Sequence, residues 1–119
     1  MDAAAQDLQH DRRATLTVSE AQLEGACKHT DPEDPTCAKL SISGEMQKVP
    51  SEQLDEAEEL LFSRHPAMKD WPADHKFEMY ELHIQTMSLL DWYGGAHIIS
   101  PEEYFAADVP KVQQQFQQA

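Results

Sequence analysis

Alternating hydrophobic and polar residues predict two strands in the first half of the chain. Residues 14–18 alternate between aliphatic side chains and threonine. This period of two is typical of a strand with one solvent-exposed face. A second alternating segment covers 38–49, and Gly44 within it predicts a bulge or a sharp twist. Between the two strands, prolines and acids in residues 24–37 indicate a loop.

Helical periodicity is clearest between residues 51 and 65. The hydrophobic positions that recur there at helical spacing are Leu54, Ala57, Leu60 and Leu61. Ser51 is expected to cap this helix, and Pro66 is expected to end it. Shorter helices are predicted over 2–10 and, after the sequence Ser-Pro-Glu-Glu, over 100–107.

The second half of the chain also contains strand patterns. Residues 77–92 predict one long strand or two short ones, and 97–99 predict a last short strand. The segment 68–72 before them is an irregular crossover with a large hydrophobic anchor, Trp71. Residues 110–119 are rich in glutamine and are expected to be a frayed helix or a disordered tail. The pattern predicts a β-rich α+β protein.

The charge of the chain excludes several classes of function. With 22 acidic and 9 basic residues among 119, the formal net charge is −13. This charge argues against binding to nucleic acid or to anionic lipid, both of which need clustered lysine and arginine. No hydrophobic run reaches the roughly 20 residues that span a bilayer. The first residues do not have the pattern of a secretory signal, so the chain as written is expected to be cytoplasmic.

Five segments, in order along the chain, form a combination that is typical of one protein family. They are Ala14-Thr15-Leu16-Thr17; Cys27 and Cys37 flanking Asp31-Pro32 and Pro35; Leu40-Ser41-Ile42-Ser43-Gly44; Phe62-Ser63-Arg64-His65-Pro66-Ala67-Met68-Lys69-Asp70-Trp71-Pro72; and Trp92-Tyr93-Gly94-Gly95 followed by Ile99-Ser100-Pro101-Glu102-Glu103-Tyr104. The ordered set resembles the CREG family of secreted cellular-repressor glycoproteins.

This resemblance implies the FMN-binding split barrel of the pyridoxamine-phosphate-oxidase type. That fold is a six-stranded antiparallel barrel, usually a homodimer, and its enzymes bind FMN at the dimer interface. The CREG branch is regarded as lacking flavin and oxidase activity, is secreted or endolysosomal, and is linked to growth control and differentiation. The match covers only the later part of the family domain. We therefore expect residues 1–109 to form a partial domain, incomplete at its N-terminus, whose open strand edges favour self-association.

The resemblance also favours a disulfide between the two cysteines, Cys27 and Cys37. Closing this short loop is expected to stabilise the fold by roughly 2–3 kcal/mol. Two reduced cysteines are the alternative in a reducing compartment. A zinc site formed by Cys27, His29 and Cys37 is the least favoured interpretation because it lacks a fourth ligand, so no metal site is predicted.

Four residues could contact a flavin if one is bound. Gly94 and Gly95 allow the backbone to approach a planar ring, Tyr93 could stack on it, and Arg64 could hold a phosphate. The simpler interpretation is a β-turn with core aromatics, including Trp92, and a helix terminus at Arg64. No pair of residues with the spacing of an acid–base or nucleophilic site is present, so no catalytic residue is predicted.

The sequence therefore favours a non-catalytic module that forms a homodimer and binds an unidentified protein partner, with no cofactor. Its contact surface is expected to include a sheet edge and the hydrophobic residues around Trp71, Trp92 and Tyr93. The alternative function is an FMN-dependent oxidoreductase with its flavin between two subunits. A third interpretation is a fragment that has no independent function.

Overall fold

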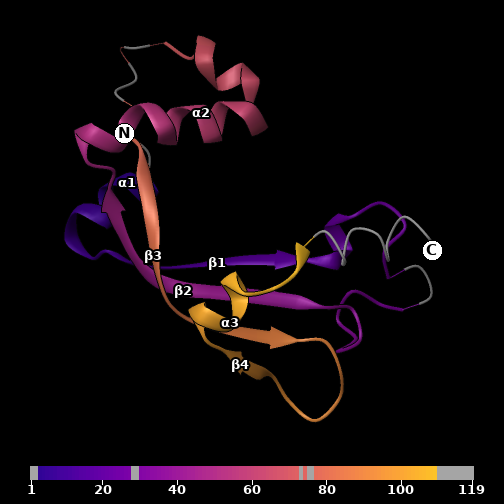
Figure 1. The fold of residues 1–119 in the computed structure, drawn as a ribbon. Coiled ribbons are helices and arrows are strands. Elements are labelled where there is room, and N and C mark those ends of the chain that lie inside the picture. Colours follow the sequence, from indigo (N-terminus) through magenta and orange to yellow (C-terminus); the bar gives the residue numbers. More distant parts are fainter. Residues whose placement is uncertain (1–2, 28–29, 73, 75–76, 110–119) are drawn as a thin grey trace. The chain divides into compact units, whose positions relative to one another are not determined.

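The computed structural model describes residues 3–27, 30–72, 74 and 77–109, which form four strands and several helices (Figure 1). The strands are β1 (Arg13–Ser19), β2 (Lys39–Lys48), β3 (Tyr80–Leu90) and β4 (His97–Ile99). The α-helices are α1 (Ala3–His10), α2 (Leu54–Arg64) and α3 (Pro101–Phe105), and the 3-10 helices are Glu20–Gln22, Ser51–Gln53 and Pro66–Asp70. None of the described helices is both long enough and apolar enough to cross a membrane. The expected tail over 110–119 lies outside the described residues.

The four strands form one sheet in the order β1-β2-β3-β4. Thr15 lies opposite Ser43 and Thr17 opposite Ser41, with hydroxyl oxygens 2.9 and 3.3 Å apart, so β1 and β2 are antiparallel. Strands β3 and β4 are also antiparallel, with Met87 opposite Ile99. Strands β1 and β4 are the edges of this sheet, which therefore does not close into a barrel within the described residues. The predicted fold class, an incomplete split-barrel-like sheet with one main helix, is confirmed.

The chain divides into two compact units, and β1, β2 and β3 each contribute residues to both. The first unit contains Met1–Thr15 and Ser43–His83, and the second contains Leu16–Ile42 and Ile84–Ala119. Each unit thus combines part of the sheet with helices and loops of its own.

Helix α2 is the main helix of the first unit and confirms the helix predicted from residue 51 onward. It ends where the His65 amide donates to the Leu61 carbonyl, 2.8 Å away, just before a proline. The predicted cap is wrong, because Gln53 occupies the N-cap of α2 and Ser51 lies in the preceding 3-10 helix. No residue of α2 is fully buried, and its hydrophobic stripe is only partly covered, because Leu60 is 67% exposed while the other stripe residues are partly exposed.

The second unit contains strand β4 and helix α3. Helix α3 begins at a capping box, in which the Ser100 hydroxyl accepts a hydrogen bond from the Glu103 amide at 3.2 Å. The turn before β4 contains Gly94 and Gly95 at φ values of +98° and +100°, a region that residues with a Cβ rarely adopt. The sequence therefore fixes this turn through two adjacent glycines.

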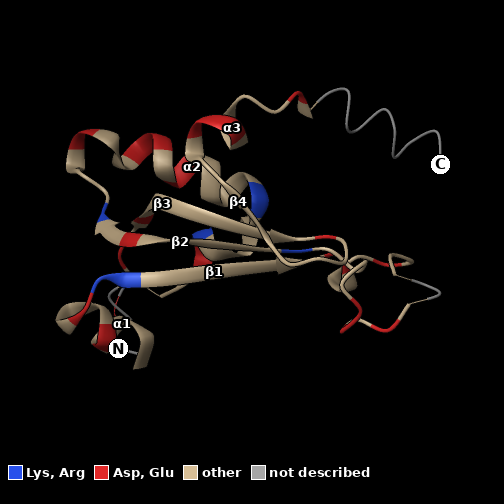
Figure 2. Ribbon diagram, turned by 90° about the horizontal axis from the view of Figure 1, so that it is seen from below, with Lys and Arg blue, Asp and Glu red and all other residues tan. Residues whose placement is uncertain are grey.

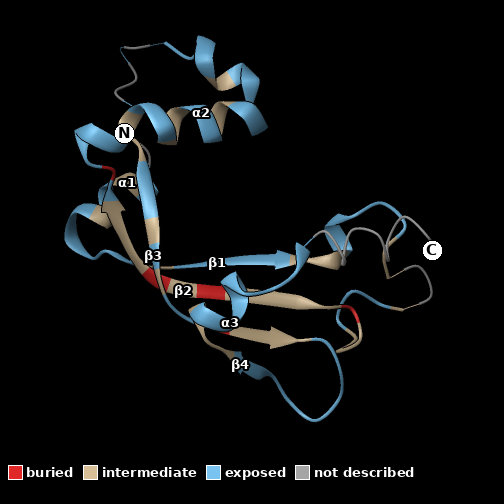
Figure 3. Ribbon diagram, in the orientation of Figure 1, coloured by how far each residue is buried: buried red, intermediate tan, exposed pale blue. Residues whose placement is uncertain are grey.

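The hydrophobic core of the described residues is small (Figure 3). The buried hydrophobic residues are Cys37, Ile42, Val49 and Met87. The hydrophobic face predicted for the first strand is not covered, because Leu16 and Val18 are 56% and 45% exposed. Trp92 and Tyr93 are 62% and 61% exposed, so their expected place in the core is wrong for this chain on its own.

Candidate functional site

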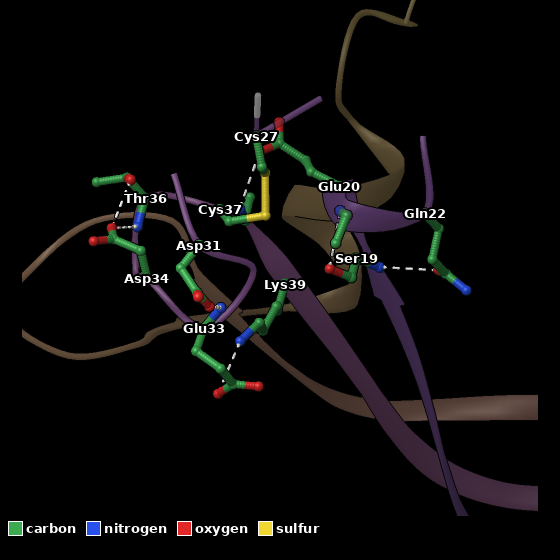
Figure 4. The surroundings of a disulfide bond; sticks show 12 residues. Ser19, Glu20, Gln22, Cys27, Asp31, Glu33, Asp34, Thr36, Cys37 and Lys39 are labelled. Carbon is green, nitrogen blue, oxygen red and sulfur yellow. Dashed lines mark hydrogen bonds and ion pairs between the residues drawn. A yellow bond between two sulfur atoms is a disulfide. The ribbon is translucent and has the colours of Figure 1, made fainter. Parts of the chain in front are cut away.

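A disulfide joins Cys27 and Cys37 in the second unit and closes the acidic loop between them (Figure 4). The Cα atoms of the two cysteines are 5.5 Å apart, an ordinary separation for a disulfide. Cys37 is fully buried, whereas Cys27 is partly exposed and adopts a positive φ of 56°. His29, the third member of the zinc alternative, lies outside the described residues.

A carboxylate, Glu20, lies beside this disulfide. Its Oε2 atom is 3.7 Å from the Cys27 sulfur and accepts a hydrogen bond from the Ala38 amide at 3.0 Å. The Glu20 amide donates in turn to the Ala38 carbonyl, also at 3.0 Å. Glu20 is thus held to the residue next to Cys37 by both its backbone and its side chain. Sequence reasoning missed Glu20 because a contact across 18 positions leaves no local pattern.

The 3-10 helix that carries Glu20 begins with a capping box of its own. The Ser19 hydroxyl accepts a hydrogen bond from the Ala21 amide at 3.2 Å, and the Gln22 side chain accepts one from the Ser19 amide at 3.3 Å. These bonds fix the turn between β1 and the disulfide loop. They therefore fix the backbone from which the Glu20 side chain extends toward the disulfide.

Carboxylates organise the disulfide loop through short-range hydrogen bonds. Asp34 accepts from both the amide and the hydroxyl of Thr36, at 2.9 and 2.7 Å. The hydroxyl and then the amide of Thr36 lower the pKa of Asp34, with a further contribution from the hydroxyl of Tyr93. Lys39 forms an ion pair with Glu33 at 3.7 Å. The lowered pKa favours the ionised form of Asp34. This carboxylate accepts the two hydrogen bonds from Thr36 that hold the turn.

The aromatic turn around Trp92 lies near this loop in the same unit. Tyr93 donates a hydrogen bond to Asp34 at 3.5 Å, and the rings of Trp92 and Tyr93 meet edge to face with centroids 5.6 Å apart. A Cβ built at Gly94 or Gly95 would meet nothing within 4 Å. These glycines are therefore required by the backbone conformation and not by close packing inside this chain.

The four residues considered for a flavin are divided between the two units. Tyr93, Gly94 and Gly95 belong to the second unit, whereas Arg64 ends α2 in the first. Neither unit by itself brings all four together. Acidic residues stand on α2, α3 and the loops, while the lysines and arginines are few and, apart from the adjacent Arg12 and Arg13, scattered along the chain (Figure 2).

Two basic residues of the sheet, Arg13 and Lys48, are engaged in exposed ion pairs. Arg13 forms a two-pronged pair with Asp11, with a shortest distance of 2.6 Å, and its hydrogen bonds lower the pKa of Asp11 to about 2. Lys48 pairs with Glu78 at 3.0 Å, which lowers the pKa of the glutamate. These cations neutralise local carboxylates, so neither is placed as a free phosphate ligand.

Comparisons with known proteins give a consistent picture of the family and the fold. The family model described as "CREG, beta-barrel" matches residues 1–106. Protein CREG1 of Gallus gallus is 40% identical over 106 residues, which cover 88% of this chain and 55% of that protein. Protein CREG2 of Homo sapiens is 40% identical over 111 residues, covering 92% of this chain and 38% of that protein. The chain thus spans about half, or less, of the curated relatives it matches.

Among solved structures, the fold matches a heme-binding protein from Mycobacterium smegmatis. The TM-score is 0.71 and the sequence identity is 20%, and the match covers 90% of this chain and 41% of the other. At this level of identity the likeness establishes the fold alone.

Proposed function

This chain belongs to the CREG family, and from that premise we propose that it is a non-catalytic split-barrel module that acts through protein–protein contacts, first of all with a second copy of itself. The proposal extends to a secreted or endolysosomal setting and to the family's role in growth and differentiation. A disulfide in the loop is compatible with such an oxidising setting.

The observation that carries this proposal is the hydrophobic surface left uncovered on the edges of the sheet. On edge strand β1, Leu16 and Val18 are exposed, and on edge strand β4, Ile98 is 72% exposed. An edge strand also presents unpaired backbone amides and carbonyls, which another chain can pair with. Burying one large hydrophobic side chain contributes about 1.5–3 kcal/mol, so covering several of them can drive association.

The surface proposed for self-association combines the β4 edge with the aromatic turn that precedes it. Trp92, Tyr93 and Ile98 form this surface, and all three are more than half exposed. Aromatic side chains of this kind contribute most of the binding energy in many protein interfaces. The net charge of −13 opposes association of two identical chains, so dimerisation is expected to strengthen as salt screens the repulsion.

Sedimentation velocity of the purified chain, over a series of protein and salt concentrations, tests this proposal. Trp92→Ala is expected to weaken the dimer by about 30-fold or more, as for an interface residue that contributes about 2 kcal/mol or more. Leu60→Ala is the matched control, because Leu60 is 67% exposed on α2 and lies outside the proposed surface. A monomer at every concentration, or equal weakening by both variants, would exclude this surface as a dimer interface.

A second candidate function is cofactor binding by the split barrel, either of FMN in an oxidoreductase or of heme. The fold likeness to a heme-binding protein favours it, and the exposed rings beside Gly94 and Gly95 offer a stacking surface. Titration with FMN, followed by flavin fluorescence, and with heme, followed by its Soret absorbance, distinguishes the two cofactors. Saturable binding near micromolar, about −8 kcal/mol, would support this function. No binding of either at millimolar concentration would leave self-association as the proposed function.

A further inference from the structure

We propose that reduction of the Cys27–Cys37 disulfide creates a binding site for a zinc-like divalent cation, with Glu20 as the third protein ligand. One ligand atom from each of these residues lies within 4.8 Å of the other two. Two thiolates and a carboxylate are a ligand set that zinc accepts, and three protein ligands leave a fourth position for water.

The distance between the Cys27 sulfur and the Glu20 carboxylate already suits two ligands of one tetrahedral ion. With Zn–S near 2.3 Å and Zn–O near 2.0 Å, the sulfur–oxygen edge of a tetrahedron is about 3.5 Å and the sulfur–sulfur edge about 3.8 Å. The Cys27 sulfur is 3.7 Å from Glu20 Oε2, so this pair needs almost no adjustment. Only the two sulfurs must separate once the bond between them is broken, by rotation of their side chains.

Glu20 is positioned independently of the disulfide. Neither the hydrogen bond from the Ala38 amide to its Oε2 atom nor the backbone bond from Glu20 to Ala38 involves a cysteine, so we expect both to persist when the cysteines are reduced. Hydrogen bonds of this kind orient the ligands of metal sites. The carboxylate is therefore held in place before a metal arrives, which lowers the ordering cost of binding.

Burial and charge also favour a cation here. Cys37 is fully buried while Glu20 and Cys27 are partly exposed, so an ion can enter from one side and keep a bound water. The nearby lysine, Lys39, pairs with Glu33 at 3.7 Å. The loop also contains Asp31 and Asp34, and their charges attract divalent ions over a longer range.

The chemistry balances with a dithiol as the reductant. The dithiol transfers two electrons and two protons to the protein disulfide, which gives two cysteine thiols and an oxidised reductant. The cation then displaces the two thiol protons to solvent and binds the resulting thiolates. Because the ion binds the dithiol and not the disulfide, each tenfold rise in free zinc above the dissociation constant shifts the equilibrium about tenfold toward the dithiol.

Cobalt(II) titration of the reduced chain under anaerobic conditions is the first test, because thiolate-bound tetrahedral cobalt absorbs in the near ultraviolet and the visible. We expect one cobalt per reduced chain and none per oxidised chain. Glu20→Gln is expected to weaken binding at least tenfold, since its amide oxygen still accepts from the Ala38 amide but carries no charge. Glu24→Gln, which removes the same charge from an exposed site nearby, is expected to bind like the wild type.

A redox titration of the disulfide with and without free zinc is the second test, and it does not depend on colour. Zinc should shift the wild-type equilibrium toward the dithiol and shift that of Glu20→Gln less. Far-ultraviolet circular dichroism of the reduced chain shows whether it is folded in each titration. The proposal is wrong if the reduced chain binds no metal, or if the two glutamate variants bind alike, because an unfolded dithiol would bind without any dependence on Glu20.

Discussion

Met87 is the residue through which the small core of the second unit can be tested most directly. It is fully buried on β3, opposite Ile99, whereas Ile98 on the partner strand is 72% exposed. Truncating each to alanine removes a hydrophobic side chain of similar size from adjacent positions of one strand pair. The two variants therefore compare a covered position with an uncovered one in the same local structure.

The expected cost of Met87→Ala follows from its burial. The substitution removes Cγ, Sδ and Cε, and at about 0.8 kcal/mol for each buried methylene-sized group the transfer cost is about 2.4 kcal/mol. The cavity left behind raises the total to about 3 kcal/mol, within the 2–5 kcal/mol known for such truncations. Ile98→Ala is expected to change the free energy of unfolding by less than about 0.5 kcal/mol, as for surface substitutions generally.

Urea unfolding followed by circular dichroism measures both changes in the free energy of unfolding. The titrations are run at low micromolar concentration, so that self-association contributes little, and are then repeated at a higher concentration. If Ile98 is covered in a dimer, its substitution should become more costly at the higher concentration while the cost of Met87→Ala changes less. Equal costs for the two variants at the lowest concentration would refute the burial argument.

The remaining predictions concern the loop, its charge and the last helix. Replacing both Cys27 and Cys37 by serine should lower the free energy of unfolding by about 2.7 kcal/mol, from loop-closure entropy across a separation of 10 residues, and urea unfolding measures this loss. Since the fold lowers the pKa of Asp34 below its ordinary 3.8, its stabilising effect is complete above that value and is lost as pH falls through the lowered pKa. The difference in unfolding free energy between the wild type and Asp34→Asn should therefore vanish in acid. Ser100→Ala removes the cap of α3, worth about 1 kcal/mol, and should speed hydrogen exchange of the amide it bonds about fivefold.

Local periodicity was enough to predict most of the secondary structure. The predicted strands over 14–18, 38–49 and 97–99 agree with the observed ones within about two residues, and 77–92 contains the single long strand β3. The capping serine before α3, together with the proline and the glutamate in its first turn, also identified its start. These features depend on neighbours in sequence, which is why a single sequence reveals them.

Burial and long-range contacts could not be predicted in this way. Trp92 and Tyr93 are large aromatic residues of the kind that usually lies in a core. In the described part of the chain, however, no neighbouring segment covers them, and both stay more than half exposed. Glu20 reaches the disulfide because β1 and β2 pair, which places it beside Ala38. Neither outcome is encoded by residues a few positions apart, so both required the three-dimensional structure.

The disulfide also makes two exposed loops of the second unit respond differently to a cut in the backbone, because it closes only one of them. A protease that cuts once within residues 31–36 leaves both fragments linked through Cys27 and Cys37, so the nicked chain gains only the mass of one water and separates into two pieces only when it is reduced. A cut after the exposed Trp92 has the opposite consequence, because no disulfide holds the released piece, which is retained by non-covalent contacts such as the pairing of β4 with β3 and the hydrogen bond from Tyr93 to Asp34. Limited digestion, analysed with and without reductant, would thus show which of the two exposed loops opens first.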